Sequence, residues 1–129
     1  MTATKNIHLS DTDYRKLAGI LASMKRKGNL RAPHLRTLQE ELTSAVIVPE
    51  GEVPEEIVGM GSTVQYRNSL TGAVASATLV FPAEADADKG KVSVLAPLGA
   101  ALIGETVNTE VRCLAPDSTW TMEILSVEH

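Results

Sequence analysis

One stretch, residues 92–104, limits the fold more than any other part of the chain. Its first part, up to Leu95, is apolar and β-branched, which predicts a strand. Pro97 ends the strand ladder because proline has no N–H to donate. Apolar residues then recur at helical spacing, at Leu98, Ala101 and Leu102. Gly104 is typical of a left-handed residue that ends a helix, so the stretch predicts a strand followed at once by one short helix.

The rest of the second half has the pattern of a β-sheet that this helix would cover. Alternating and β-branched segments predict five strands, over residues 62–68, 73–81, 91–95, 107–114 and 119–127. Turn residues separate them, and an acidic surface loop occupies 83–90. We therefore expect an α+β fold with mostly antiparallel strands and the helix on one sheet face.

The first half predicts two amphipathic helices after a loose lead-in over residues 1–9, in which Ile7 and Leu9 suit a short edge strand. Ser10 caps the first helix, residues 11–26, and Asp13 completes a capping-box pattern. Gly28-Asn29 forms a turn, and Pro33 suits the start of the second helix. The second apolar stripe consists of Leu35, Leu38, Leu42, Ala45 and Val46. The pair is an antiparallel helical hairpin, either packed on the body or projecting as a short coiled coil, and its narrow stripes favour the projecting form.

A connector rich in Pro, Gly and Glu follows Val48 and is the natural boundary between two parts, residues 1–48 and 49–129. Residues 1–48 carry eight Lys/Arg and four Asp/Glu, net +4, whereas residues 49–129 carry four and twelve, net −8. This asymmetry indicates that the two parts face different surroundings.

Composition excludes several classes of protein. The single cysteine, Cys113, excludes an intramolecular disulfide framework and a CxxC metal site, and its alternating surroundings favour a buried, inert thiol. No apolar run approaches the ~18 residues of a membrane span, and there is no apolar signal core. We expect a cytoplasmic monomer with no membrane contact. Only four aromatic residues and a net charge of −4 argue against base stacking and a general nucleic-acid surface.

The sequence shows no catalytic constellation. His8, His34 and His129 lie far apart without Asp, Cys or Ser partners at catalytic spacing, and no cofactor is expected. The alternating carboxylates Glu84, Asp86 and Asp88 lack a calcium-loop pattern, so a solvated loop is the default interpretation. The most distinctive polar feature is a basic cluster without any acid over residues 25–36; its cations are Lys25, Arg26, Lys27, Arg31 and Arg36. It is either a solvated turn or a contact for an acidic protein or a nucleic-acid backbone.

Residues 94–104, VLAPLGAALIG, are similar to the signature of the C-terminal domain of GreA/GreB-type transcript cleavage factors. Further matches follow in the same order as in that domain, at residues 58–64, 82–86 and 123–128. The amino-acid sequences of residues 55–58 and 95–102 resemble the regulator of nucleoside diphosphate kinase (Rnk) family more closely still. The resemblance implies an FKBP-like fold for residues 49–129 and a partner, RNA polymerase.

The resemblance also implies a docking site and separates two functions. Gre factors dock through the proline that matches Pro97 and an acidic residue two positions earlier, where Leu95 stands here. The implied contact is therefore Leu95, Ala96, Pro97 and Leu98. Gre factors also present two acidic residues at the tip of a long coiled coil, which help to hold a catalytic Mg²⁺. The arm here is short and its tip carries Lys25, Arg26, Lys27 and Arg31, which cannot ligate Mg²⁺.

The resemblance thus implies a non-enzymatic transcription regulator that binds RNA polymerase near the secondary channel without transcript cleavage, and competes with Gre-type factors. It predicts no direct sequence-specific contact with nucleic acid. The alternatives are a cleavage factor of the GreA/GreB type, an adaptor with another protein partner and, more remotely, a prolyl isomerase, since fold alone does not give activity.

Overall fold

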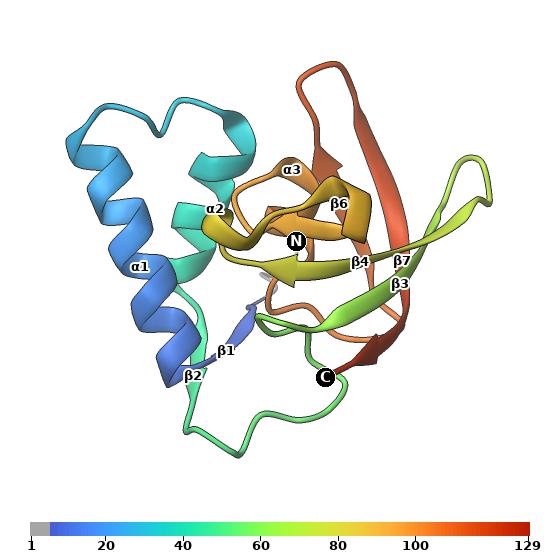
Figure 1. The fold of residues 1–129 in the computed structure, drawn as a ribbon, viewed down its shortest axis with the longest axis horizontal. Helices are drawn as coiled ribbons and strands as arrows, with labels where there is room; N and C mark the ends of the chain where they lie inside the picture. Colours follow the sequence, from blue (N-terminus) through green and yellow to red (C-terminus); the bar gives the residue numbers. More distant parts are fainter. Residues whose placement is uncertain (1–5) are drawn as a thin grey trace, which may run out of the picture.

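The computed structural model describes residues 6–129, which form three α-helices and two β-sheets (Figure 1). The helices are α1 Asp11–Arg26, α2 Pro33–Thr43 and α3 Pro97–Leu102. The strands are β1 His8–Ser10, β2 Val46–Val48, β3 Thr63–Asn68, β4 Val74–Val80, β5 Lys91–Ser93, β6 Glu110–Leu114 and β7 Thr119–Glu128. Two 3₁₀ turns, Pro82–Glu84 and Ala87–Lys89, lie between β4 and β5.

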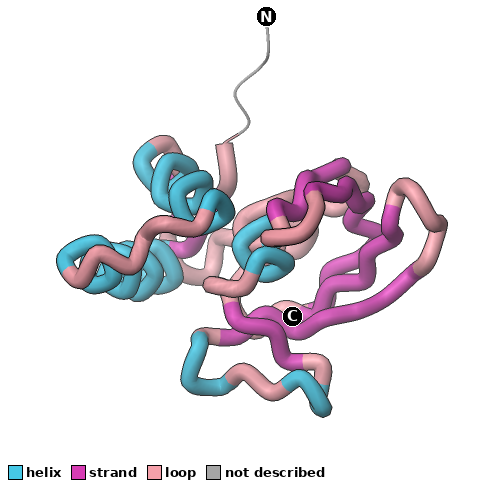
Figure 2. Tube along the Cα trace, turned by 90° about the horizontal axis from the view of Figure 1, so that it is seen from above, coloured by secondary structure: helices cyan, strands magenta, loops and turns pink. Residues whose placement is uncertain are grey.

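The larger sheet has five strands in the order β5-β4-β3-β7-β6 and curls around α3 (Figures 1 and 2). Its pairs are antiparallel except β4 with β5, so the predicted, mostly antiparallel α+β arrangement is confirmed. The strand predicted over residues 107–114 is shorter in the structure. β6 begins only at Glu110, because Asn108 adopts a left-handed φ of 67° and a turn occupies the residues before the strand. The strand β5 ends at Ser93, whose carbonyl already accepts a hydrogen bond from Ala96 N.

The predicted short helix occupies the place expected of it. In α3, Leu102 is fully buried with sheet residues such as Val64, Met122 and Ile124. The helix ends just before Gly104, which is left-handed with φ 76° as predicted. The helix therefore closes the concave face of the sheet with apolar side chains.

The helices α1 and α2 lie side by side against the body (Figures 1 and 2). α2 packs on α3 and β6, and the apolar stripes of both helices belong to the same core as the sheet; their buried members are Leu17, Leu21, Leu35, Leu38 and Leu42. The predicted projecting coiled coil is wrong: the structure has the helices packed on the body. The reason is that their leucines bury apolar area against α3 and the sheet as well as against each other.

The predicted second helical stripe was too long. α2 ends at Thr43, so Ala45 and Val46 are not helical. The β-branched run 46–48 instead forms β2, which pairs in parallel with β1. The short edge strand expected in the lead-in is confirmed as β1, and Ile7 and Leu9 are each 1% exposed; the first five residues lie outside the described range. No helix within residues 6–129 has the length and apolar character that crossing a membrane requires.

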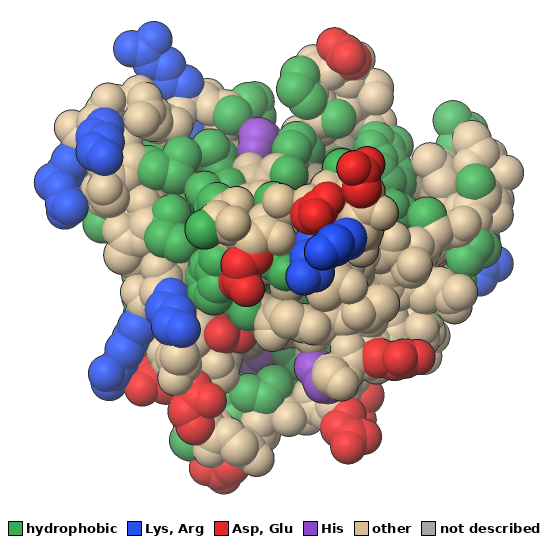
Figure 3. Space-filling model, viewed as in Figure 1, with side chains coloured by type: hydrophobic (Ala, Val, Ile, Leu, Met, Phe, Trp, Pro, Cys, Tyr) green, Lys and Arg blue, Asp and Glu red, His purple; other side chains and the backbone are tan. Residues whose placement is uncertain are grey.

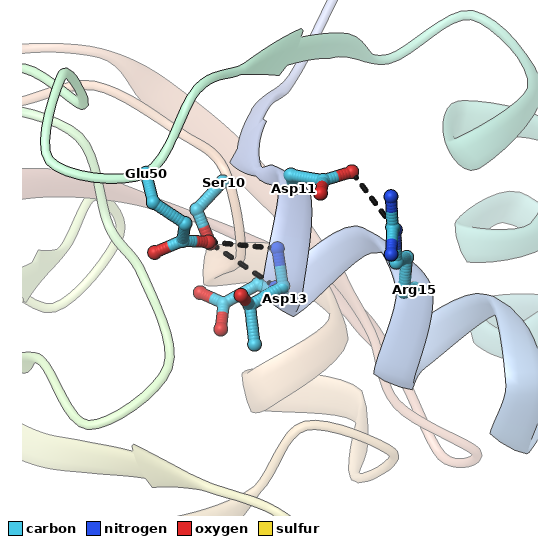
Figure 4. Close-up of polar contacts among 6 residues, drawn as sticks. Ser10, Asp11, Asp13, Arg15 and Glu50 are labelled. Carbon is cyan, nitrogen blue, oxygen red and sulfur yellow. Dashed lines mark hydrogen bonds and ion pairs between the residues drawn. The ribbon is translucent and has the colours of Figure 1, made fainter.

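The first turn of α1 is bound to two distant segments, and Figure 4 shows the bond to one of them through Glu50. Ser10 Oγ accepts from Asp13 N at 3.1 Å, as its predicted capping role requires. The Asp13 carboxylate in turn accepts from Met60 N at 3.1 Å, and Glu50 Oε1 accepts from Thr12 N at 2.7 Å. The helix is thereby attached to the connector, because its first N–H groups have no partners within the helix, and through the Asp13 carboxylate to the loop before β3.

This arrangement gives a prediction for pH dependence. Burial, first, and the nearby Glu50 carboxylate raise the pKa of Asp13 above its ordinary value, although the Met60 bond opposes this. The folded state then binds the proton of Asp13 more tightly than the unfolded state, so this contribution to stability is present at low pH and lost as pH rises through the raised pKa. We expect Asp13→Asn, which keeps an acceptor for Met60 N, to unfold at equal or higher urea concentration than the wild type at pH 7.

Asp13→Ala is the matched variant, because it removes the acceptor as well as the charge. It should lose about 1–2 kcal/mol, the typical cost of a part-buried N–H without a partner. Urea unfolding at several pH values between 4 and 7 measures both, and any advantage of Asp13→Asn should shrink toward pH 4. Equal losses for the two variants would show that the charge itself, not the acceptor, stabilises the helix start.

Candidate functional site

The four residues implied as a docking contact form one continuous turn. Leu95, Ala96, Pro97 and Leu98 lie where β5 leads into α3, and each is half-buried. Ser93 shapes the turn: its Oγ accepts from Leu95 N and its carbonyl from Ala96 N, both at 3.0 Å. Ala96 is the N-cap of α3 and Pro97 occupies the first helical turn, where its missing N–H costs nothing. The turn is therefore rigid and presents part of each side chain to solvent.

A histidine with no role in the sequence patterns connects this turn to the helices. His34 Nε2 of α2 donates to the carbonyl oxygen of Leu95 at 2.8 Å. The two residues are 61 positions apart, and no spacing rule connects them. This bond fixes α2 directly against the turn, so the helices and the candidate contact form one unit.

A hollow of about 330 Å³ adjoins the turn between α2, α3 and β6. Pro97 and Ala101 of α3 form part of its wall, with His34 of α2 and Val111 of β6. Glu105, which is only 6% exposed, also lines it. The hollow combines apolar walls with a few charged groups, a composition that suits a contact for a protein side chain or small ligand.

The basic cluster lies elsewhere. Lys25, Arg26, Lys27 and Arg31 are all exposed at the end of α1 and in the loop that follows it. Figure 3 shows Lys and Arg side chains along the edge of the molecule formed by α1 and this loop. The structure brings the four members of each predicted site together, but it does not join the two sites. They adjoin separate hollows on opposite faces of α2.

The acidic loop is explained by its local structure. Asp86 caps the second 3₁₀ turn, since its Oδ1 accepts from Asp88 N at 3.1 Å, and its backbone N–H donates to Lys91 O at 3.0 Å. Glu84 and Asp88 are exposed. Within residues 6–129, no group of three or more His, Cys, Asp or Glu side chains is arranged to hold a metal ion. The loop therefore fits its default interpretation as solvated surface.

The remaining reactive side chains have structural surroundings. Cys113 is 2% exposed, and burial raises the pKa of its thiol, which keeps it in the unreactive protonated form. His129 accepts from Ser62 Oγ at 2.9 Å through Nδ1 and donates to Glu55 O at 3.0 Å through Nε2. This histidine joins the end of β7 to the connector and to Ser62, whose hydroxyl is fully buried and also accepts from Gly59 N at 3.0 Å, so the pair is structural.

Comparison with known proteins agrees with this geometry. The sequence profile of the family described as transcription elongation factor, GreA/GreB, C-term, matches residues 53–129. The chain is 32% identical over 124 residues to the regulator of nucleoside diphosphate kinase of Escherichia coli K12. The aligned region covers 95% of this chain and 89% of that protein. It is 33% identical over 115 residues to transcription elongation factor GreA of Solidesulfovibrio magneticus, covering 89% and 70%.

A solved structure extends the likeness to the whole fold. The prokaryotic transcription elongation factor GreA/GreB from Nitrosomonas europaea superposes with a TM-score of 0.76 at 30% identity, covering 98% of this chain and 100% of that one. The matched profile includes the α3 turn and all five strands of the larger sheet. The chain therefore belongs to the GreA/GreB C-terminal family of transcription factors, with a relative in the regulator of nucleoside diphosphate kinase along nearly its full length.

Proposed function

We propose that this protein is a non-enzymatic transcription regulator that binds RNA polymerase near its secondary channel, does not support transcript cleavage, and competes there with Gre-type factors. Family membership supports the polymerase as partner. The observation that carries the regulatory part is the cationic end of α1, where Lys25, Arg26 and Lys27 are exposed and no carboxylate lies among residues 25–36.

The dimensions of the helices support the same conclusion. α1 has 16 residues and α2 has 11, so they are about 24 Å and 17 Å long at ~1.5 Å per residue. A cleavage factor must carry acidic residues deep into the channel to help hold Mg²⁺. This pair is short and its end carries ammonium and guanidinium groups, which have no oxygen to offer a metal ion.

We further propose a division of labour between the two parts. Residues 49–129 form an FKBP-like docking body whose contact is the turn Leu95–Leu98. Residues 1–48 carry α1 and α2, which lie against the body and direct the basic tip, Lys25 to Arg31, toward the channel mouth. The His34–Leu95 bond supports a fixed orientation of the hairpin relative to the docking turn.

The test is a binding assay with purified core RNA polymerase, followed by competition with a Gre factor and an assay of transcript cleavage on stalled complexes. We expect binding, mutual displacement and no stimulation of cleavage. Stimulated cleavage would favour the cleavage-factor alternative. A failure to bind would favour an adaptor with another protein partner and would contradict the proposal.

A single charged substitution in the turn Leu95–Leu98 tests whether this turn contacts the polymerase. Pro97→Glu should weaken polymerase binding about tenfold or more, because it buries a carboxylate in the interface without a designed partner. The fold should survive, since an acidic residue is favourable in the first turn of a helix. Affinity and thermal unfolding measure the two effects.

Leu70→Glu is the matched control. Leu70 is 89% exposed at the β3–β4 turn, so the same charge is introduced away from the proposed contact. It should leave the affinity for polymerase unchanged. Equal effects of the two variants, or no effect of Pro97→Glu, would remove the turn from the interface.

A further inference from the structure

A second hollow, of about 400 Å³, lies at the tip between the end of α1 and the outer face of α2. Three cationic side chains line it, one each from α1, the connecting loop and α2: Lys25, Arg31 and Arg36. Leu30, Gln39 and Glu40 complete its polar and apolar walls. Three positive charges against one negative give the hollow a net charge of about +2 at neutral pH.

The backbone beneath the first cation is fixed by hydrogen bonds. Gly28 is left-handed with φ 74°, which only glycine adopts without cost. Gly28 N donates to Lys25 O at 3.1 Å, and Asn29 N donates to Met24 O at 2.8 Å. These two bonds are the Schellman arrangement that ends a helix. The direction in which the chain leaves Lys25 is therefore set.

The second cation is fixed by alternation along the loop. Leu30 and Ala32 are half-buried and pack against the core, whereas Arg31 between them is exposed. The two neighbours thus attach the loop and direct Arg31 outward. Arg36 and Gln39 follow on the first turns of α2, whose own leucines are buried. The backbone positions of the three cations around the hollow are thus set before any ligand arrives, which reduces the entropic cost of binding.

The composition of the hollow defines its ligand. Arginine forks bind phosphate oxygens with two parallel hydrogen bonds, and lysine adds a point charge. No aromatic side chain lines the hollow, so there is no platform on which a base could stack. The volume lies at the lower end of the range of small-molecule sites and does not match an extended strand.

We propose that this hollow binds a compact polyphosphate anion, with at least two linked phosphates, through Lys25, Arg31 and Arg36. Recognition depends on the phosphates, whether they are inorganic or belong to a nucleotide. The site goes beyond the proposed function because it needs no polymerase, and it is tested on the purified protein alone.

Isothermal titration calorimetry at low salt with tripolyphosphate, pyrophosphate and orthophosphate is the first experiment. Affinity should fall in that order. Because recognition depends on the phosphates, ATP should bind within about threefold of tripolyphosphate. Raising the salt concentration should weaken all of them, since the cations are exposed.

The matched variants are Arg31→Gln and Lys27→Gln. Both remove one exposed charge from the same tip, but only Arg31 lines the hollow. Arg31→Gln should weaken tripolyphosphate binding about tenfold, the value of one charged hydrogen-bond pair, and Lys27→Gln less than about threefold. Thermal unfolding confirms that both variants fold.

Three results would overturn the proposal. Equal losses in the two variants would mean a diffuse field rather than a site. Binding of single-stranded RNA without binding of tripolyphosphate would assign the tip to a nucleic-acid backbone. A preference of more than tenfold for ATP over tripolyphosphate would show recognition of the nucleoside. None of these results bears on polymerase binding, so the two proposals fail independently.

Discussion

Replacing Gly99 with alanine is expected to destabilise the protein by more than about 3 kcal/mol, the largest effect expected of any glycine-to-alanine change in residues 6–129. A Cβ at this position would lie 2.1 Å from the carbonyl oxygen of Ser93 and 2.9 Å from Cα of Val94. Gly99 belongs to α3 and has no left-handed conformation, so the cost is steric and not conformational.

The backbone that the methyl group meets cannot move away cheaply. Val94 N donates to Val80 O at 2.9 Å, and the Ser93 carbonyl accepts from Ala96 N at 3.0 Å. Moving this segment breaks bonds at the end of β5, and moving α3 opens the core around Leu102. Thermal and urea unfolding should show the loss, as a fall in Tm of roughly 10 °C or more for a domain of this size.

Gly19→Ala is the matched control on α1. This glycine is exposed, and a Cβ would meet nothing within 4 Å. Alanine there should stabilise the protein by about 0.5–1 kcal/mol because glycine is a poor helix former. If Gly99→Ala cost less than about 1 kcal/mol, α3 would not lie as close to β5 as the structure has it.

Gly104→Ala should have the next largest effect, about 2–4 kcal/mol, for two separate reasons. Its φ of 76° is unfavourable for alanine, and the added Cβ would lie 2.6 Å from the Cβ of Ile7. The methyl group would also lie 3.2 Å from the backbone N and O atoms of His8. It would displace β1, whose His8 N donates to Gly104 O at 3.0 Å.

Gly28→Ala separates the two reasons. Gly28 has a similar φ of 74°, but a Cβ there would meet nothing within 4 Å. This variant should lose only the conformational part, about 1–2 kcal/mol. The difference between the two variants in urea unfolding then measures the contact with Ile7. Equal losses would show that β1 can move aside without cost.

The sequence determined the elements whose signals are local. The apolar, β-branched start of 92–104, its proline and its terminal glycine depend on backbone preferences of single residues, and α3 appears with Pro97 in its first turn. The core face of α1 follows from 3.6-residue periodicity in the same way, and its Leu17 and Leu21 are buried. Such signals are complete within a few residues, so no partner is needed to interpret them.

The extent of α2 shows where local signals stop. Ala45 and Val46 continue the helical spacing of the leucines before them, yet Val46 pairs with His8 in a parallel strand. This pairing depends on the unpaired backbone N–H and C=O groups of β1, which lies far away in the sequence. The periodicity of residues 35–46 contains no information about that strand. Val46 and Ile47 on this strand are 40% and 46% exposed, so the strand pairing and not burial of these side chains decides their conformation.

The candidate sites divide in the same way. The sequence placed Leu95–Leu98 in one turn and Lys25–Arg31 at one helix end, because each set is contiguous. Only the tertiary structure could bring His34 to Leu95, Asp13 to Met60, or Arg36 beside Lys25 and Arg31. These pairings depend on how α2 packs, and packing follows from burial of the leucines on its other face and not from the polar residues themselves. The sequence therefore determined which groups each segment carries, and the shared core decided which of them meet.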